Sequence, residues 1–279
     1  MRGMFAKVAA LVALGWVPAG VGAQEVVGKF HWQAGQVLQY KVTHRTLAAD
    51  TGAGGRHELE SQVEQVKRWQ VLDVDAAGVA TVQLTLTRIK MHQRVPGGEV
   101  LGFDSDRPEQ AHPQLRAQLA PLLNKPLVTL RVDPYGRVAE VKSAQQEQVN
   151  RYQSELPFTV ILPGVALEAG QQWKRDYRIV LDPPLGTGEV YSAEQVYAVR
   201  SAGNGRATIA FGTTIKDLPP DPSDRIPLLQ FQPRGEVVFD AQTGCIVSAR
   251  VVSSGVVEGH GGEGSRYEFR TEYTEELVR

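Results

Sequence analysis

Histidine and aspartate side chains are the groups in this sequence that could do acid–base or metal chemistry. No His-x-x-x-His pair is present, so the spacing of a helical zinc site is missing. Asp104 with Asp106, and Asp221 with Asp224, could bind calcium, but neither segment offers the roughly five or more oxygen ligands of a dedicated site. The Ser-Asp-Arg sequence shared by both segments is better explained by a turn with a capping aspartate. We therefore expect no metal and no cofactor.

Nucleophilic catalysis has no recognisable motif here. The chain contains no Gly-x-Ser-x-Gly elbow and no Ser-x-x-Lys pattern. Its single cysteine, Cys245, follows a turn, and a buried apolar role is favoured over a catalytic thiol. We assign no catalytic residue and expect a protein that is not an enzyme. An enzyme would need residues from two distant segments to meet, and we would then look at His31, His44 and the loop of Asp104 and Asp106.

Aromatic residues give the best indication of a binding surface. A row of aromatic side chains on a sheet usually packs in the core. It lines a groove for a lipid or another hydrophobic ligand where a curved sheet is left partly uncovered. Both interpretations stay open, and the candidate ligand-binding residues are Trp32, Tyr40, Trp69, Trp173, Tyr267, Phe269 and Tyr273.

These aromatic residues lie in segments that alternate between apolar and polar residues. Leu38, Tyr40 and Val42 alternate with polar neighbours, and the segment 266–274 does so most clearly. A period of two is typical of a strand with one buried face. Short connections that begin with Asp and end with Gly, at 75–78, 133–136 and 240–244, favour antiparallel hairpins.

Short motifs recur in the same order along the chain, which predicts an internal duplication. Ala34–Gln36 recurs as Ala169–Gln171, and Pro121–Leu123 recurs as Pro227–Leu229. The spacing between matches falls by twelve residues around Pro108–Ala120, where leucines have helical spacing. This difference predicts a short helix in the first copy that the second copy lacks.

The predicted organisation is mainly β. A first β copy covers 24–143, a linker with a helical start covers 144–165, and a second β copy covers 166–279. We expect five or six antiparallel strands in each copy. The two copies join into one curved sheet or pack as a split barrel, with the apolar residues on the concave side.

The first residues are typical of an export signal. Arg2 and Lys7 precede the apolar run Val8–Val17, and small residues end at Ala23, after which we expect cleavage. The run is too short for a membrane span, which needs about 20 residues, and no other segment approaches that length. A net charge of -1 argues against a nucleic-acid partner. The mature protein is expected to be exported, to the periplasm or outside the cell.

Dispersed residues resemble an exported bacterial family known only as a domain of unknown function. The likeness covers most of the mature chain and rests on Ala34, Gly35, Gln36, Tyr40, Trp69, Gly78, Ala80, Pro121, Pro126, Asp133 and Gly136. More loosely, long strands with a covering helix are similar to the periplasmic lipoprotein-carrier folds, and that resemblance implies acyl-chain binding. Neither resemblance implies a catalytic residue.

The sequence therefore favours an exported, non-enzymatic envelope protein that binds a hydrophobic ligand or lipid on a curved β surface. An alternative is a scaffolding module whose exposed strand edges pair with another envelope protein. A third hypothesis is a hydrolase-type enzyme with a site between the two copies.

Overall fold

The computed structural model describes residues 25–144 and 156–278, so the predicted export signal lies outside the described residues. The fold is mainly β, as predicted. The elements are β1 (Val37–Gly52), β2 (Gly55–Val74), β3 (Ala80–Arg94), β4 (Val100–Asp104), the 3-10 turn η1 (Pro108–Gln110), α1 (Pro113–Leu119), the 3-10 turn η2 (Ala120–Leu122), β5 (Pro126–Val132), β6 (Val138–Ala144), β7 (Gln172–Leu181), β8 (Glu189–Gly203), β9 (Arg206–Ile215), α2 (Pro222–Arg225), the 3-10 turn η4 (Pro227–Phe231), β10 (Arg234–Asp240), β11 (Cys245–Glu258) and β12 (Arg266–Val278).

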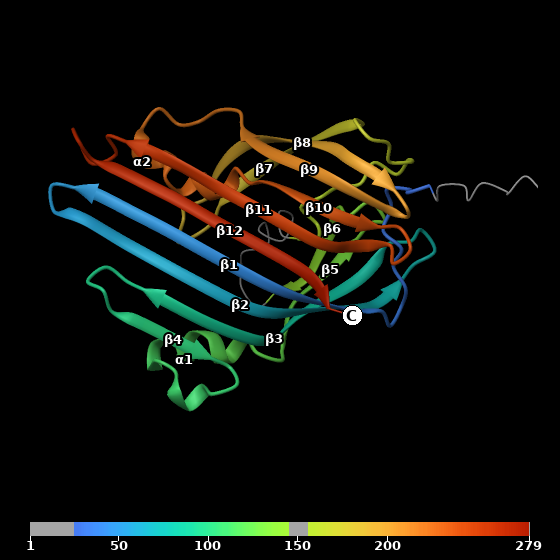
Figure 1. The fold of residues 1–279 in the computed structure, drawn as a ribbon, viewed down its shortest axis with the longest axis horizontal. Coiled ribbons are helices and arrows are strands. Elements are labelled where there is room, and N and C mark those ends of the chain that lie inside the picture. Colours follow the sequence, from blue (N-terminus) through green and yellow to red (C-terminus); the bar gives the residue numbers. More distant parts are fainter. Residues whose placement is uncertain (1–24, 145–155, 279) are drawn as a thin grey trace, which may run out of the picture.

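All twelve strands form one antiparallel sheet that does not close on itself. Its order is β6-β5-β3-β2-β1-β12-β11-β10-β9-β8-β7, with β4 added beside β3. The sheet curves, so that β5 and β6 lie behind β1 and β12 in Figure 1. Of the two predicted arrangements, the structure therefore has the single curved sheet.

Strands β1 and β12 join the two halves of the sheet. Their pairing runs from Gln39 opposite Val278 to Thr51 opposite Arg266. Starting at β7, the sheet follows the chain to β12 and continues through β1, β2, β3, β5 and β6. Each half therefore contributes a meander of its own, with six strands including β4 in the first half and six in the second.

The predicted alternation along the strands is confirmed. In β1, Leu38, Tyr40 and Val42 are buried, whereas Gln39 and Lys41 between them are exposed. The buried hydrophobic residues described here form four clusters, and the two largest, which draw on both halves, also contain residues of the segment 156–167. One face of the sheet is thus filled by a chain segment rather than by a second sheet.

The segment 156–165 is the largest departure from the predicted organisation. We expected a linker here. The structure instead places Leu156, Phe158, Val160 and Leu162 in the core, with exposures between 0% and 5%. The described part of this segment consists of turns, and the predicted helical start lies outside the described residues. The segment serves as core because its apolar residues cover the concave face of both halves.

The predicted helix in Pro108–Ala120 is present as α1, whose Leu115 packs under β3 and β4. The prediction that the second half lacks this helix is confirmed, because only Ile226 separates the residues that match Ser105–Arg107 from those that match Pro121–Leu123.

A single helical turn, α2, forms instead at the Ser-Asp-Arg sequence of the second half, because the Asp221 side chain accepts the Ser223 N–H (2.8 Å) and Pro222 occupies its first position. Four residues are too few to produce a helical periodicity that the sequence could display.

The predicted Asp-to-Gly turns are each held by the side chain of their aspartate. The Asp133 carboxylate accepts the backbone N–H groups of Tyr135 and Arg137, both at 2.8 Å, and the Asp240 carboxylate accepts those of Gln242 (2.9 Å) and Thr243 (3.1 Å). Each aspartate thereby replaces a backbone acceptor in its turn. These turns close the hairpins β5–β6 and β10–β11.

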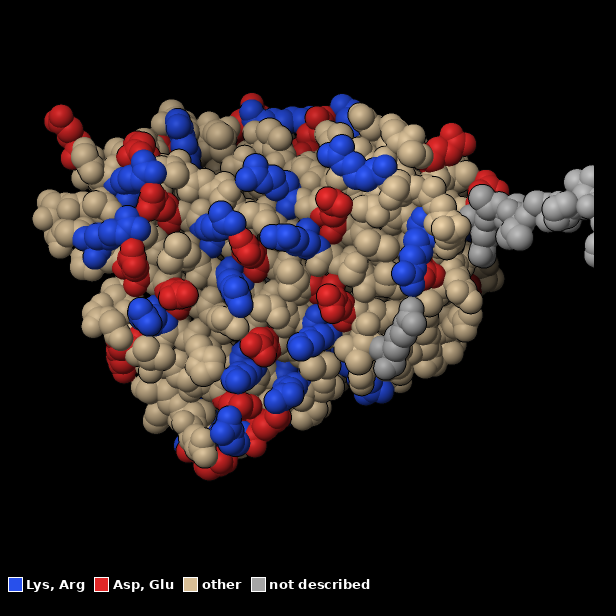
Figure 2. Space-filling view, in the orientation of Figure 1, with Lys and Arg blue, Asp and Glu red and all other residues tan. Residues whose placement is uncertain are grey.

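The convex face carries interleaved charges of both signs (Figure 2). Arg56 on β2 pairs with Glu268 on β12 at 3.0 Å, and Arg266 pairs with the same carboxylate at 2.8 Å. Exposed pairs of this kind contribute little to stability. The face shown in Figure 2 has no extended region of one charge.

Candidate functional site

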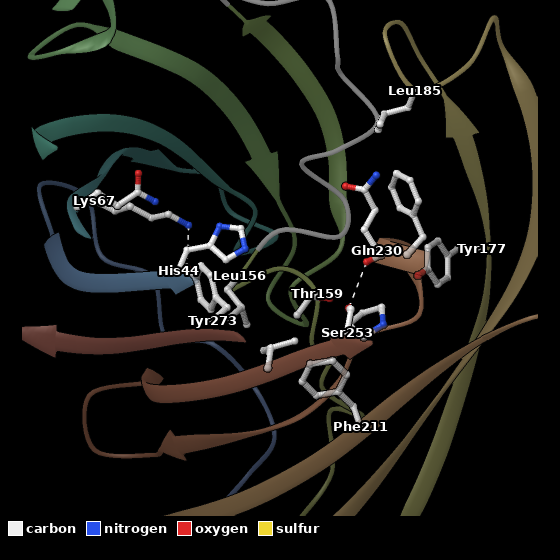
Figure 3. Close-up of a pocket in the computed structure, with 14 residues that line it drawn as sticks. His44, Lys67, Leu156, Thr159, Tyr177, Leu185, Phe211, Gln230, Ser253 and Tyr273 are labelled. Atoms are coloured by element: carbon white, nitrogen blue, oxygen red, sulfur yellow. Dashed lines mark hydrogen bonds between the residues drawn. The ribbon is translucent and has the colours of Figure 1, made fainter. Parts of the chain in front are cut away.

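A cavity of about 470 Å³ lies on the concave face where the two halves meet. It has a polar end on β1, β2 and β12 and an apolar end on β7, β9 and η4 (Figure 3). Its volume falls within the roughly 300–1,000 Å³ typical of small-molecule sites. The lining residues are His44, Gln65, Lys67, Leu156, Thr159, Tyr177, Leu185, Phe211, Gln230, Phe231, Pro233, Val251, Ser253 and Tyr273.

The strand register explains why the polar residues face inward. Lys67 lies opposite the buried Tyr40, and Tyr273 lies opposite His44. Residues opposite one another in an antiparallel pair point to the same face of the sheet. Lys67 and Tyr273 therefore project to the side on which Tyr40 packs into the core.

The polar end contains a hydrogen-bonded set of buried side chains. Lys67 Nζ donates to the Tyr273 hydroxyl at 2.9 Å, and that hydroxyl donates to Glu275 Oε2. Lys67 and Glu275 are each only 2% exposed. Buried charges are costly unless they are paired and hydrogen-bonded. The Tyr273 hydroxyl connects the ammonium to the carboxylate and so helps to keep both groups inside the sheet.

His44 adds a titratable group to the same end. Its Nε2 lies 2.5 Å from Thr271 Oγ1, and its ring meets the Tyr273 ring edge-on with centroids 6.0 Å apart. Burial lowers the pKa of His44 below its ordinary value of 6.5, and the Lys67 charge lowers it further. The imidazole is therefore uncharged at neutral pH.

The apolar end is built from aromatic and aliphatic side chains. Phe211 projects from β9, Phe231 ends η4, and Leu185 lies at the rim. Ser253 on β11 donates its hydroxyl to the Gln230 carbonyl (3.2 Å), which ties η4 to the sheet at this point. The cavity can thus bury an apolar chain at one end and satisfy a polar group at the other.

The floor of the cavity is the segment that starts at Leu156, and the second half holds it in place. Trp173 Nε1 donates to the Ile161 carbonyl at 2.7 Å, and Arg175 donates to the Thr159 carbonyl at 3.2 Å. The Tyr197 hydroxyl lies 3.0 Å from the same Thr159 oxygen, and burial raises the pKa of Tyr197 to about 12. These contacts satisfy the backbone carbonyls of an irregular buried segment.

Of the seven aromatic residues proposed from the sequence, Tyr273 lines the cavity. Trp32, Tyr40, Trp69 and Trp173 pack in the core beneath it. The rings of Trp69 and Phe158 meet edge-on at 5.0 Å, and the Tyr40 hydroxyl donates to the Ile246 carbonyl at 2.8 Å.

Tyr267 and Phe269 lie farther along β12 on the same face as Tyr273. The Tyr267 ring meets that of His260, at 6.2 Å. A ligand-binding role for these two residues and for the four core aromatics stays a prediction.

Lys67, Gln65, Phe211 and Phe231 were missed by the sequence reasoning. One signal for them was present, because Trp69, Lys67 and Gln65 occupy alternate positions of β2 and so share one face. On β2, the polar residues Lys67 and Gln65 continue the face of the buried Trp69, and they lie where the core ends and the cavity begins. No comparable signal exists for the two phenylalanines, since the tertiary fold alone brings them to the cavity.

The places named for possible catalysis are separate. His44 lies in the cavity, whereas the His31 N–H donates to the Gly244 carbonyl (3.0 Å) at the β10–β11 turn. Asp104 caps the N–H of Asp106 at 3.0 Å, and Asp106 pairs with Arg88 at 2.5 Å. Each of these groups has a structural partner in its own region.

Cys245 is buried at the start of β11, and burial raises the pKa of its thiol. Within residues 25–144 and 156–278, no cluster of three or more histidine, cysteine or acidic side chains has the arrangement to hold a metal ion. The helices described are all too short or too polar to cross a membrane.

Comparisons with known proteins identify the fold only. No family model and no curated protein matches the sequence. Among solved structures, the chain is similar to one of lipovitellin, reported for its lipid–protein interactions, with a TM-score of 0.52 and 12% identity over 89% of this chain. This chain spans 26% of that protein's length. At such low identity, the likeness supports a shared β architecture and nothing more.

Two further structures cover nearly the whole chain but superpose poorly. One is DynF from the dynemicin biosynthesis pathway of Micromonospora chersina, with a TM-score of 0.22 and 9% identity, covering 99% of this chain and 94% of that one. The other is an outer membrane channel from Pseudomonas putida F1, with a TM-score of 0.25 and 9% identity, covering 94% of this chain and 100% of that one. Scores this low carry no argument about function.

Proposed function

We propose that this protein binds an amphiphilic, lipid-like ligand in the cavity between its two halves, without catalysing a reaction on it. The observation that carries the proposal is the cavity itself. About 470 Å³ is open on the concave face, with a polar end and an apolar end. Burial of an apolar chain there contributes roughly 0.8 kcal/mol for each CH₂ group.

The β architecture shared with lipovitellin supports this proposal, since that structure was reported for its lipid interactions. We further propose that the mature chain is exported after cleavage at Ala23, which would place it where envelope lipids are present. The order of β7–β12 and then β1–β6 in the sheet supports the proposed duplication. In this account, the ligand lies across the junction of the two copies.

Equilibrium binding of a fluorescent fatty-acid analogue to the mature protein tests the proposal. Val251→Trp is expected to weaken binding at least about tenfold, because the indole would fill cavity space beside Tyr273. Val256→Trp is the matched control. It lies on the same strand, on the opposite face, with 49% of Val256 exposed, and it is expected to leave the affinity unchanged.

Two outcomes would contradict the proposal. One is the absence of probe uptake by the wild-type protein, with no lipid released from it by solvent extraction. The other is equal binding by both tryptophan variants, because the probe would then bind outside the cavity. Recovery of one abundant protein partner from crosslinked cells, without lipid, would favour the scaffolding alternative.

A further inference from the structure

The volume of the cavity limits how much of a lipid it can hold. A volume of 470 Å³ corresponds to about sixteen water molecules at their liquid share of ~30 Å³ each. A CH₂ group is of similar size, so the cavity has room for one acyl chain of about sixteen carbons. A lipid with two such chains would have to leave the second chain outside.

Phe231 forms a wall at the apolar end. Its ring lines the cavity and also packs against a separate cluster of buried residues in the second half, so it lies between the two. That cluster consists of Ile179, Leu181, Ala193, Ile215 and Leu228. The Ser253 hydroxyl donates to the carbonyl of the preceding residue, Gln230, at 3.2 Å, which fixes the wall to β11.

We propose that the cavity selects lipids with a single acyl chain of up to about sixteen carbons, and that the Phe231 ring sets this limit. Each CH₂ group that moves from water into the cavity is expected to raise the affinity up to about fourfold. Once the chain reaches Phe231, a further CH₂ group stays outside and adds little. This inference rests on the proposed function.

The second chain of a two-chain lipid counts against binding. It would leave the membrane together with the first chain but would find no apolar space in the cavity. Each of its CH₂ groups that is exposed to water is expected to reduce the affinity up to about fourfold. The ligand class is therefore that of single-chain lipids, such as fatty acids and lysophospholipids.

A series of saturated fatty acids from decanoate to eicosanoate tests the limit on chain length. Each is measured by displacement of the fluorescent fatty-acid analogue from the mature protein. The affinity is expected to rise with every added CH₂ group up to palmitate, whereas palmitate and eicosanoate are expected to bind within about twofold of each other. A steady rise through eicosanoate would overturn the limit and leave the proposed function intact. Failure of every acid to displace the probe would contradict the proposed function itself.

Truncation of the wall tests the role of Phe231. In Phe231→Ala, the space vacated by the ring extends the apolar end, so eicosanoate is expected to bind at least about tenfold more tightly than palmitate. Tyr191→Ala is the matched control, because Tyr191 is also partly buried against the cluster behind Phe231 but does not line the cavity. It is expected to keep the wild-type ratio of the two affinities. The wild-type ratio in Phe231→Ala, or an equal change in both variants, would refute Phe231 as the wall that sets the limit.

Competition between one-chain and two-chain lipids tests the number of chains. The mature protein is incubated with vesicles that contain equal amounts of myristoyl lysophosphatidylcholine and dimyristoyl phosphatidylcholine, and the retained lipid is identified by native mass spectrometry. These lipids share a head group and a chain length and differ in the number of chains. We expect the lysophospholipid to be retained in at least about tenfold excess, with one molecule for each protein. Equal retention of the two-chain lipid would overturn the selectivity for a single chain.

Discussion

The concave face has a packed part around Phe158, called the base here, and a part that lines the cavity, called the cavity end. Both are formed by the same strands, and they differ in what fills them. At the base, Phe158 reaches up to Trp69 and Trp32, and the rings leave no room for a ligand. At the cavity end, β2 presents Lys67 and Gln65 instead. A change of two residues along one strand thus separates packed core from open site. The comparison shows that stability and binding are located in adjoining parts of one sheet.

The largest effect is expected from truncation of a phenylalanine at the base. Phe158→Ala removes a ring that is 1% exposed and is expected to lower the free energy of unfolding by about 3–5 kcal/mol. Phe231→Ala, at the partly exposed end of η4, is expected to cost less than about 1.5 kcal/mol. Urea denaturation of both variants measures this difference. Equal losses would mean that the cavity end is as tightly packed as the base.

Two glycines offer the next comparison. Gly136 and Gly97 both have positive φ, so alanine at either position is expected to cost about 1–2 kcal/mol in backbone strain. At Gly136 an added Cβ would also lie 2.8 Å from the Phe30 ring and 3.0 Å from the Val160 carbonyl, whereas at Gly97 it would meet open space. Gly136→Ala is therefore expected to be the more destabilising, as measured by thermal unfolding. The reverse order would show that the base tolerates repacking.

A smaller effect is expected from removal of a single hydroxyl. Tyr40→Phe leaves the Ile246 carbonyl without its side-chain donor and is expected to cost about 1–2 kcal/mol. Tyr267→Phe, farther along the same face and partly exposed, is expected to stay within about 0.5 kcal/mol of the wild type. Denaturant midpoints of the two variants provide the test. A loss of stability in Tyr267→Phe as large as that in Tyr40→Phe would contradict the expected difference between these two positions.

The smallest expected effect is a pH dependence at the cavity end. Burial lowers the pKa of His44 below 6.5, so the unfolded chain takes up a proton first as the pH falls. The His44 contribution to stability is therefore present above pH 6.5 and is lost as the pH decreases through 6.5 toward the lowered pKa of the folded state. His44→Gln should lack this component. The stability difference between wild type and variant is expected to shrink between pH 8 and pH 5, and a constant difference would contradict the account.

Much of the sheet could be predicted from the sequence, because the signals are local. The alternation around Tyr40 and the Asp-to-Gly turns at Asp133 and Asp240 each depend on a few neighbouring residues. The short helix α1 was predicted for the same reason.

The cavity could not be predicted, since it depends on where the segment after Leu156 stops covering the sheet. Its apolar residues were consistent with a linker as well as with a core. Only the fold shows that the segment packs against Trp69 and also borders the cavity through Leu156 and Thr159.

The position of a bound ligand tests the central claim most directly. A crystal structure of the mature protein with a palmitate analogue brominated at the end of its chain would locate the bromine by anomalous scattering. We predict one bromine site beside Phe211 and Phe231, with the head group toward the polar end of the cavity. A bromine site on the convex face or at the strand edges, with the cavity filled only by water, would contradict the account.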